Sequence, residues 1–501
     1  MSSRLENINE QRHQKLDKLR QQGVDPYPHR YERTHTTAQA IAELERREAN
    51  DDPKQRILGI EDEDISVAGR LTAIRHMGKS SFADLRDGTG KIQLLFRKND
   101  YDEPTQELLK DLDIGDIIGA RGALMRTRTG EVTVGIKGFT LLTKSLQPLP
   151  EKWHGLADTE KRYRQRYLDL IANAEVRDVF IVRSRVIAAV RDFLNGRGFI
   201  EVETPVLQPA AGGALANPFV THHHALDQDF YLRIALELHL KRLMVGGLDK
   251  VYEIGRIFRN EGISTKHNPE FTLLESYEAY ADYNDVMAMT EQMLYAVSME
   301  VLGTAEVAYQ GNSISFKPPW PRLSLREAVK EHSGIDFNDY PEADALREKM
   351  RAMGMDAETG KSWAKLVDDL ISDYVEPRLV QPTFLYDYPI AMSPLAKSKA
   401  DDPETVERFE AFAGGGLEIA NAYSELNDPL EQRQRFEAQL NQRDTTDEEK
   451  WTIDEDYLLA LEYGMPPTGG LGIGIDRLVM LLTDQPSIRE VILFPQLRDK
   501  G

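Results

Sequence analysis

The stretch GRIFRNEGISTKHNPEFTLLES, residues 255–276, decides the fold of the larger part of this 501-residue chain. Both of its flanks are rich in aromatic and β-branched residues, and the centre, NEGISTKHNPE, has the Gly, Asn, Ser and Pro of a loop. The pattern predicts a long hairpin of two antiparallel strands. Because strand side chains alternate between faces, Phe271, Glu275 and Tyr277 are expected to share one face.

Charged side chains are concentrated in and around this loop, and they allow two interpretations: Arg256, Arg259, Glu261, Lys266, His267 and Glu275. A charged hairpin loop is most often a solvated tip. A carboxylate at Glu275, on a strand face that also carries an aromatic ring, is costly to bury unless a cation meets it. The segment by itself leaves open whether it is a solvated tip or part of a ligand site.

Composition limits the classes of protein that the chain can belong to. With 41% hydrophobic and 29% charged residues it is typical of a soluble globular protein, and its length suits about three domains. The start, MSSRLENINEQRHQKLDKLRQQG, has no apolar signal region, and no later stretch is long and apolar enough to span a membrane, so we expect a cytoplasmic protein. The chain has no cysteine, which excludes disulfides, thiolate metal sites and a cysteine nucleophile.

The formal charge of −21 argues against a general electrostatic attraction to nucleic acid. Binding of nucleic acid would have to use local basic patches. Arg75, Phe82 and Gln93 suit such a role if they share one face of a β-barrel, because a ring stacks on a base and an amide forms hydrogen bonds with its edge. They belong to residues 65–147, whose pattern predicts such a barrel.

The composition and the pattern of apolar and turn residues divide the chain into four predicted regions. Residues 1–64 predict an N-terminal helix, over about residues 3–22, and a charged, irregular lead-in over residues 45–64. Residues 65–147 contain short alternating runs with turn signals at Asp87-Gly88 and Thr129-Gly130 and predict a five-stranded barrel of the OB type; another small β-domain is the alternative. Residues 148–157 form a linker with two prolines, and residues 158–501 mix helices and strands.

Within the last region, two segments have clear patterns. VFIVRSRVIAAVRDFLNGRG predicts a helix that ends at its glycines, and FIEVETPVL predicts the strand after it. Two amphipathic stretches predict a helical insertion at about 325–380.

Two familiar nucleotide motifs are absent, and a different constellation takes their place. HMGKSS lacks the first glycine of a P-loop, and no G-x-G-x-x-G fits GGLGIGIDRL, so P-loop and Rossmann sites are excluded. GLGIGIDRLVMLL predicts a strand that runs into a helix with Arg477 in its first turn, where a polyphosphate binds well. FEAFAGGGLEIANAYSELNDP adds carboxylates, which near a triphosphate most often carry Mg²⁺.

Together these stretches resemble the three motifs of class II aminoacyl-tRNA synthetases. GFIEVETPVLQPAAGGA is similar to motif 1 and the segment after it, GRIFRNEG...KHNPEFT to motif 2, and GGLGIGIDRL to motif 3. The resemblance is to bacterial-type lysyl-tRNA synthetases in particular, and it covers nearly the whole chain. It implies an α+β protein with an N-terminal OB-fold β-barrel that binds the anticodon and a catalytic domain built on an antiparallel sheet flanked by helices.

The resemblance also implies a function and a set of site residues. The family joins L-lysine to ATP as lysyl-adenylate, transfers the lysine to the 3′ end of tRNA(Lys), uses Mg²⁺, and forms a homodimer through motif 1. The implied catalytic residue is Arg259, which would bridge the α-phosphate and the lysine carboxylate. The implied ATP-binding residues are Arg259, Glu261, His267, Asn268, Phe271, Glu410 and Arg477. The implied lysine-binding residues are Gly213, Glu237, Glu275, Tyr277, Asn421 and Glu425. The implied metal ligands are Glu410 and Glu418, and the implied anticodon contacts are Arg75, Phe82 and Gln93.

The choice of lysine also agrees with charge. A lysine molecule presents two ammonium groups and needs a pocket with carboxylates, whereas an aspartate pocket needs basic groups, and Glu237, Glu275 and Glu425 supply the acidic set. The nearest alternative is an aspartyl- or asparaginyl-tRNA synthetase, which shares the order of barrel and catalytic domain. A second alternative is a non-catalytic nucleotide- or RNA-binding paralogue.

The chain departs from the family pattern in several places. Leu236 and His239 stand where the pattern has Pro and Tyr, His224 where it has Asn, and Ser276 where it has Phe. Glu410 and Glu418 lie eight residues apart, whereas the family spaces these carboxylates by seven. The extra residue falls near GGG at 414–416, and a bulge in the strand pair can absorb it.

Overall fold

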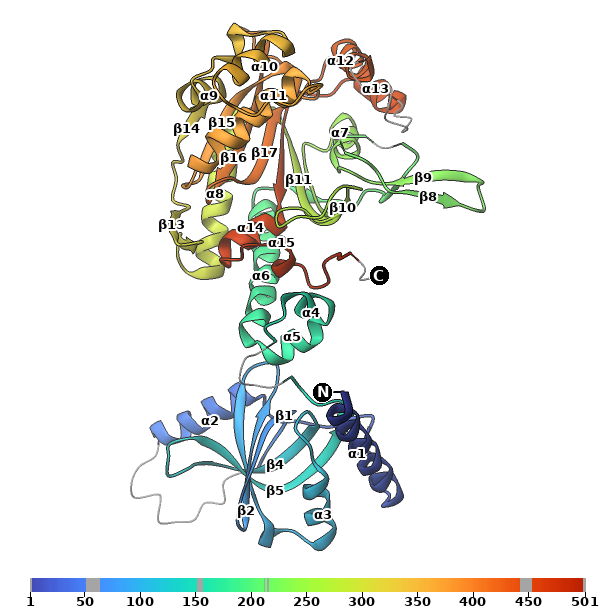
Figure 1. Cartoon of the computed structure of the whole chain (residues 1–501), viewed down its shortest axis with the longest axis vertical. Helices are drawn as coiled ribbons and strands as arrows, with labels where there is room; N and C mark the ends of the chain where they lie inside the picture. The colour runs from blue at the N-terminus through green and yellow to red at the C-terminus, as the bar shows by residue number, and fades with distance from the viewer. Residues whose placement is uncertain are drawn as a thin grey trace. The chain divides into compact units, whose positions relative to one another are not determined.

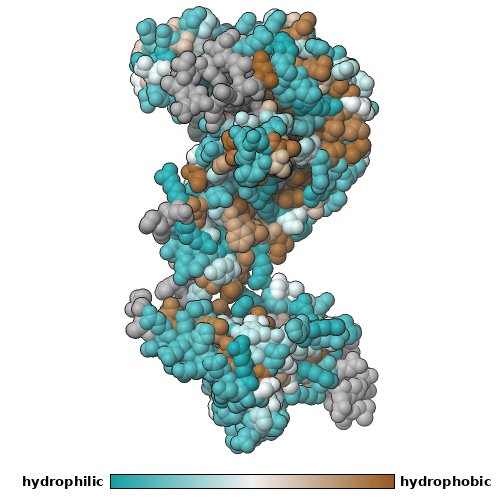
Figure 2. All heavy atoms as spheres, turned by 90° about the vertical axis from the view of Figure 1, so that its right-hand side faces the viewer, coloured by the Kyte–Doolittle hydropathy of each residue, from teal (hydrophilic) through white to brown (hydrophobic). Residues whose placement is uncertain are grey.

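The chain forms two compact units, residues 1–156 and 157–501 (Figure 1). The computed structural model describes residues 2–50, 64–150, 156–210, 212–213, 216–441 and 453–498. Most of the predicted lead-in, residues 51–63, and residues 151–155 of the predicted linker lie outside the described residues. Among the described helices, none is long and apolar enough to cross a membrane. The face drawn in Figure 2 is mostly hydrophilic, in keeping with the high fraction of charged residues.

The N-terminal unit contains a closed five-stranded barrel, which confirms the predicted OB-type fold. Its strands are β1 (Ile65–Met77), β2 (Ser80–Arg86), β3 (Lys91–Arg97), β4 (Ile117–Arg126) and β5 (Val132–Thr143). They pair in the order β1-β2-β3-β5-β4, and the pairing of β1 with β4 closes the barrel. The predicted turns at Asp87-Gly88 and Thr129-Gly130 join β2 to β3 and β4 to β5.

Three helices accompany this barrel: α1 (Ser2–Gln21), α2 (Thr37–Asn50) and α3 (Glu103–Asp111). Helix α1 was predicted, and its guanidinium at Arg12 donates hydrogen bonds to the carbonyl oxygens of Ile114, Ser145 and Gln147. Helix α3 was not predicted, although Asp102 caps it by accepting a hydrogen bond from the Thr105 amide. The expectation of irregular structure after residue 44 was wrong as far as Asn50, because α2 continues to that residue.

The C-terminal unit is built on an eight-stranded sheet in the order β14-β15-β16-β17-β18-β11-β10-β6. The bounds are β6 (Ile200–Glu201), β10 (Lys250–Phe258), β11 (Glu270–Ala279), β14 (Arg322–Ser324), β15 (Thr383–Pro389), β16 (Thr405–Ala413), β17 (Leu417–Ser424) and β18 (Thr468–Gly474). The predicted hairpin is β10 and β11, which pair antiparallel from Lys250 opposite Glu278 to Phe258 opposite Glu270. The predicted α+β class, with a mainly antiparallel sheet, is confirmed.

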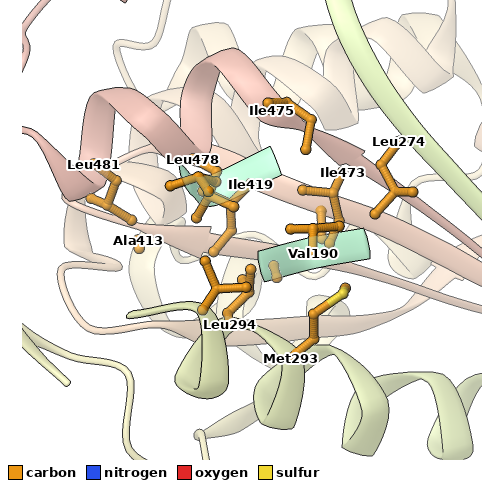
Figure 3. Close-up of a cluster of buried hydrophobic side chains, with 14 of the residues drawn as sticks. Val190, Leu274, Met293, Leu294, Ala413, Ile419, Ile473, Ile475, Leu478 and Leu481 are labelled. Atoms are coloured by element: carbon orange, nitrogen blue, oxygen red, sulfur yellow. The ribbon is translucent and has the colours of Figure 1, made fainter. Parts of the chain in front are cut away.

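One face of the sheet carries the main hydrophobic core. It is covered by α6 (Ala174–Gly196), α8 (Tyr283–Leu302) and α14 (Ile475–Leu482), whose apolar residues pack on those of β11, β17 and β18. Figure 3 shows Val190, Met293 and Leu478 from these helices meeting Ile419 and Ile473 from the sheet. This face is filled with side chains, so a ligand site of the sheet must lie on the other face.

The opposite face is covered in two places. Helix α7 (Glu237–Val245) and helix α13 (Glu455–Glu462) pack on β10 and β11, and the helices α9 (Leu325–Ser333), α10 (Ala343–Ala352) and α11 (Trp363–Leu370) pack on β15 and β16. The other elements of this unit are α4 (Thr159–Arg164), α5 (Arg166–Ala172), α12 (Pro429–Asn441), α15 (Ile488–Val491), β7 (Leu207–Gln208), β8 (Val220–His223), β9 (Gln228–Leu232), β12 (Glu306–Tyr309) and β13 (Asn312–Ser315).

The strand expected for FIEVETPVL is mostly absent. Its first part is the two-residue β6, and a second short piece, β7, begins beyond Pro205. Between them the backbone amide of Thr204 donates to a carboxylate oxygen of Glu253 instead of to a neighbouring strand. The apolar pattern is that of a strand, but a side chain of β10 takes the hydrogen bond that a ladder would have used.

Candidate active site

A cavity of about 530 Å³ opens on the second face of the sheet. Its floor comes from β11, β17 and β18, and its walls come from α7, from the loop between β10 and β11, and from residues 392–396. This volume lies in the range of small-molecule sites. Of the residues predicted for the catalytic domain, those that line the cavity are Gly213, Glu237, Arg259, Glu261, His267, Asn268, Phe271, Glu275, Tyr277, Glu418, Asn421, Glu425 and Arg477.

One end of the cavity is acidic. Glu237 begins α7, Glu275 lies on β11 and Glu425 comes directly after β17, and each is at least nine-tenths buried. Glu237 accepts a hydrogen bond from the hydroxyl of Tyr423 at 2.8 Å, and Glu275 accepts one from the hydroxyl of Tyr277 at 3.1 Å. Three segments distant in sequence thus bring three carboxylates to one place.

The position of Glu425 depends on the absence of a side chain at Gly470. A Cβ atom built on Gly470 would lie 1.8 Å from Oε1 of Glu425 and 2.8 Å from the ring of Tyr277. Any other residue would push this carboxylate aside. Gly470, in the third motif, must therefore be a glycine, because the carboxylate of Glu425 occupies the space of its side chain.

The carboxylates at the acidic end are buried with too few cationic and hydrogen-bonding partners to offset the loss of water. Burial and the nearby charge of Glu237 raise the pKa of Glu275 to about 7. Burial raises the pKa of Glu425 well above its ordinary value, even though Lys241 opposes the shift. Oε1 of Glu425 has no hydrogen-bond partner among the described residues. A buried carboxylate oxygen of this kind favours a cationic ligand.

The other end of the cavity carries two arginines. Arg259 lies 5.3 Å from the centre of the Phe271 ring, and its Nε donates to the carbonyl of Ile234 at 3.3 Å. Burial lowers the pKa of Arg259, and nearby carboxylates oppose this shift; an arginine in a protein nevertheless stays charged. Arg477, in the first turn of α14, donates to the carboxylate of Glu418 at 2.8 Å. The guanidinium groups suit an anionic ligand with an aromatic part.

Side-chain contacts hold the loop between β10 and β11 at the basic end of the cavity. Lys266 donates to the carbonyl of Gly416 at 2.8 Å, which links the loop to the turn between β16 and β17. The ring of His267 lies between Ser264 and Arg477, at 2.9 Å and 3.4 Å. Burial and the charge of Arg477 lower the pKa of His267, so this imidazole is neutral at pH 7.

A β-bulge places Glu418 in the cavity. Ala411 pairs with Ala420, and Phe412 pairs with Glu418, so Ile419 is the extra residue on β17. Without the bulge, Glu418 and Asn421 would lie on opposite faces of the strand, because they are three residues apart. With the bulge, Ile419 enters the core, as Figure 3 shows, and Glu418 lines the cavity with Asn421. The sequence offered a bulge only as a way to absorb the extra residue between Glu410 and Glu418, and that link stays a prediction.

Glu410 does not line the cavity. Its carboxylate accepts hydrogen bonds from Arg408 at 2.5 Å and from the hydroxyl of Tyr388 at 2.8 Å, and it lies on β16 opposite Asn421. Its roles in binding ATP and a metal stay predictions.

The described residues contain no group of three or more His, Asp or Glu that could hold a metal. Mg²⁺ needs only one or two carboxylates when substrate phosphates complete its shell, and Glu418 provides such an oxygen donor.

Several site residues were missed. Arg408 lines the cavity and donates to the side chain of Asn421 at 3.0 Å, and Tyr423 lines it beside Glu237. Both lie at alternate positions of strands that the sequence had marked, Arg408 two residues before Glu410 and Tyr423 two after Asn421. Strict strand alternation would have found them.

Two of the departures from the family pattern have visible consequences. The backbone amide of Leu236 donates to Oε1 of Glu275 at 3.1 Å, a bond that a proline at this position could not make. The hydroxyl of Ser276 is buried without a hydrogen-bond partner among the described residues. His239 is partly buried beside Gln208, and His224 lies after β8 in an exposed turn.

The predicted anticodon residues share the outer face of the barrel. Arg75 pairs with Phe82 across β1 and β2, and Gln93 lies on β3 opposite Asp84 of the same face. Arg75 donates to Asp84 at 2.9 Å, and Gln93 accepts from Thr133 at 3.0 Å. The ring of Phe82 is partly exposed between them.

Comparison with known proteins agrees with both units. A family model described as tRNA synthetases class II (D, K and N) matches residues 158–498, and one described as an OB-fold nucleic acid binding domain matches residues 65–142. A lysine–tRNA ligase of Dehalococcoides mccartyi is 60% identical over 99% of this chain and 98% of its own length.

Two further lysine–tRNA ligases show the same full-length similarity. That of Moorella thermoacetica is 56% identical over 97% of each chain, and that of Halalkalibacterium halodurans is 50% identical over 98% of this chain and 96% of its own. With its three motifs around one cavity and relatives of this identity over nearly its whole length, the chain belongs to the class II tRNA synthetases and, among them, to the lysine–tRNA ligase family.

Proposed function

We propose that this chain is an enzyme that activates L-lysine with ATP to lysyl-adenylate and then transfers the lysine to the 3′ end of tRNA(Lys). The observation that carries the proposal is one cavity with three buried carboxylates at one end and two arginines at the other. The acidic end fits a small molecule with two ammonium groups, and the basic end fits a nucleoside triphosphate.

In the first step, a carboxylate oxygen of lysine attacks the α-phosphorus of ATP, and pyrophosphate leaves. The reaction needs correct positioning and neutralised charge rather than a protein nucleophile. Arg259 would take this role, since it lines the cavity beside Phe271, on which adenine would stack. Its guanidinium would contact the α-phosphate and the lysine carboxylate together, and so counter the charge that builds as they meet.

Lysine recognition divides between its two ends. Glu237, with the backbone at Gly213, would bind the α-ammonium group, and Asn421, held by Arg408, would bind the carboxylate. Glu425 and Tyr277 would bind the ε-ammonium group, with Glu275 between the two ends. The free oxygen Oε1 of Glu425 supports this assignment.

ATP binding would use the loop between β10 and β11 and the start of α14. Glu261, His267 and Asn268 would contact the nucleotide, and Arg477 would hold the γ-phosphate in exchange for its bond to Glu418. Glu418, with Glu410, would hold Mg²⁺, which supplies charge neutralisation to the phosphates when it is bound.

In the second step, the terminal ribose hydroxyl of the tRNA attacks the lysyl carbonyl, and AMP leaves. The barrel would bind the anticodon through Arg75, Phe82 and Gln93, and the chain would work in the cytoplasm. A homodimer would form through motif 1, where Ile200 and Leu207 are about half exposed.

The test of the proposal is amino-acid-dependent ATP–pyrophosphate exchange with the purified chain. We expect exchange with lysine and none with aspartate or asparagine. Exchange with aspartate or asparagine and none with lysine would reject the assignment, and no exchange with any of them would favour a binding protein without catalysis.

A first prediction concerns pH. Because the pKa of Glu275 in the empty site is raised to about 7, its carboxyl group is protonated below that pH and must lose its proton to face an ammonium group. Lysine affinity should therefore fall as the pH drops below about 7, by up to about tenfold per unit for one proton, and level off above it. Calorimetric titration of lysine from pH 5.5 to 8.5 measures this, with Glu275→Gln as the control that weakens the dependence. An affinity that stays constant from pH 6 to 8 would contradict it.

A second prediction concerns the barrel. Phe82→Ala should weaken tRNA(Lys) binding by about 1–3 kcal/mol through the loss of stacking on one base, while lysine-dependent exchange stays unchanged. Filter binding and exchange measure the two effects separately. Tyr101→Ala would be a poor control, because Tyr101 donates to the carbonyl of Ile136 and supports the fold. Arg33→Ala is the better one, because the Arg33 side chain is about half exposed and pairs with Asp87 at 3.4 Å. Equal loss of both activities in Phe82→Ala would count against the anticodon role.

A further inference from the structure

One buried cation lies behind the acidic end of the cavity. Lys241, one turn after Glu237 on α7, is fully buried, and among the described residues it is not one of those that line the cavity. Its ammonium group lies 2.5 Å from Oε1 of Glu237, pairs with Oε2 of Glu425, and lies 5.5 Å from the ring centre of Tyr423. One lysine therefore links two carboxylates from different elements.

The surroundings of Lys241 keep it charged. The groups that face it are the carboxylates of Glu237 and Glu425 and the phenols of Tyr423 and Tyr457, from α7, from the end of β17, from β17 and from α13. Burial alone would lower the pKa of Lys241, but the two carboxylates outweigh it and raise the pKa. Lys241 is thus an ammonium group at every pH at which the enzyme works.

The charges of this region match one kind of amino acid. Glu237, Glu275 and Glu425 together carry three negative charges when all are ionised, and Lys241 cancels one of them. Two negative charges remain for the two ammonium groups of lysine, while Arg259 is left for its carboxylate. An amino acid with a neutral side chain would leave one buried carboxylate unpaired, which is costly.

We propose that Lys241 is a positioning residue that sets the amino-acid specificity of the cavity, by holding Glu237 and Glu425 from behind and leaving two negative charges for the substrate. The proposal rests on the proposed function and adds a specificity residue to it. Lys241 does not touch the substrate. It engages Oε1 of Glu237 and Oε2 of Glu425, and Oε1 of Glu425 is left without a hydrogen-bond partner among the described residues.

Removal of the ammonium group should change both charge and geometry. Without Lys241, carboxylates this close to one another ionise together only with difficulty, and one of them takes up a proton. The neutral acid then tolerates an uncharged side chain, and lysine has to displace the proton before it binds. Discrimination and pH dependence should change together, which a loss of packing alone would not produce.

The test is Lys241→Met, measured by ATP–pyrophosphate exchange with lysine and with norleucine, which lacks the ε-ammonium group. We expect the KM for lysine to rise by at least about tenfold, and the ratio of kcat/KM for lysine to that for norleucine to fall by at least about tenfold. The KM for ATP should stay within about twofold of wild type, because the basic end is unchanged. The pH below which lysine binding weakens should move upward, since a proton takes the place of the ammonium group.

A matched control and a chemical rescue complete the test. Lys250→Met removes a lysine whose ion pair with Glu278 is partly exposed, and it should leave all of these values unchanged. Because the chain has no cysteine, a single Lys241→Cys variant can be alkylated at one defined thiol; the position is buried, so the reaction is done on the unfolded chain, which is then refolded. An S-aminoethyl group restores the ammonium and should restore lysine specificity, whereas a neutral S-propyl group of the same length should not.

The outcomes separate cleanly. An unchanged ratio of lysine to norleucine and an unchanged pH dependence in Lys241→Met would overturn the proposal, and so would rescue by the propyl group equal to rescue by the aminoethyl group. If Lys241→Met fails to fold, the two alkylated forms still compare charge at constant volume. If the wild-type chain itself shows no lysine-dependent exchange, it is the proposed function that fails.

Discussion

Arg259→Ala is expected to lower lysine-dependent ATP–pyrophosphate exchange by at least about 10³-fold, because the variant loses the guanidinium proposed to counter the charge that builds between the α-phosphate and the lysine carboxylate. Arg259 lines the cavity, and its partners Phe271 and the carbonyl of Ile234 fix its direction. Arg408, which also lines the cavity, is already paired with Glu410 and donates to Asn421, so it would not replace Arg259. Affinity for tRNA(Lys), measured by filter binding, should stay within about twofold, because the barrel belongs to a separate unit.

Arg256→Ala is the matched control for this experiment. Arg256 lies on β10, three residues before Arg259, is about two-fifths exposed, and pairs with Glu270 at 3.5 Å outside the cavity. It should keep wild-type exchange. Arg259→Lys should recover little activity, because an ammonium group cannot reproduce the planar fork that contacts two anions. Wild-type exchange in Arg259→Ala would remove the residue from the reaction.

Glu425→Gln is expected to lower kcat/KM for lysine by about thirtyfold to several thousandfold, which corresponds to about 2–5 kcal/mol for a lost partner of a buried charge pair. The amide keeps the volume and removes the charge that would face the ε-ammonium group. It also leaves Lys241 with Glu237 as its one remaining carboxylate partner among the described residues. The KM for ATP should change little, because Glu425 lies at the acidic end of the cavity.

The comparison for this variant is Glu278→Gln. Glu278 lies on β11, three residues after Glu275, and its partly exposed side chain pairs with Lys250 at 2.6 Å. The same change of chemistry at a carboxylate outside the cavity should leave lysine activation intact. A wild-type KM for lysine in Glu425→Gln would show that the ε-ammonium group binds elsewhere.

Much of the fold could be predicted because its signals are local. The hairpin of β10 and β11 and the turns at Asp87 and Thr129 depend on short-range alternation and on turn residues. The missed elements depend on context. Helix α3 is only nine residues long, and the strand expected around Pro205 gives way to a hydrogen bond between Thr204 and Glu253, which no local pattern contains.

The residues of the candidate site could be predicted from the sequence less completely than the fold. The acidic residues could be named from the family resemblance, and the structure brings Glu237, Glu275 and Glu425 together in one cavity with Arg259. Their roles stay predictions. Lys241 could not be singled out, although it stands four residues after Glu237, because a Glu–Lys pair at that spacing most often lies on the surface of a helix. Its burial depends on α13 and on the end of β17, which are more than 180 residues away in sequence.

The bulge at Ile419 has a consequence for how the length of this segment can vary. Side chains along a strand point alternately to the two faces of the sheet. The extra residue of the bulge therefore puts every β17 side chain before it on the opposite face from the one it would otherwise occupy. Removal of one glycine from 414–416 would shorten only the turn, whereas removal of Ile419 would send Glu418 into the core and Leu417 toward the nucleotide. The alternation of β17 across the bulge, and not the length of the turn before it, is therefore what keeps Glu418 in the cavity.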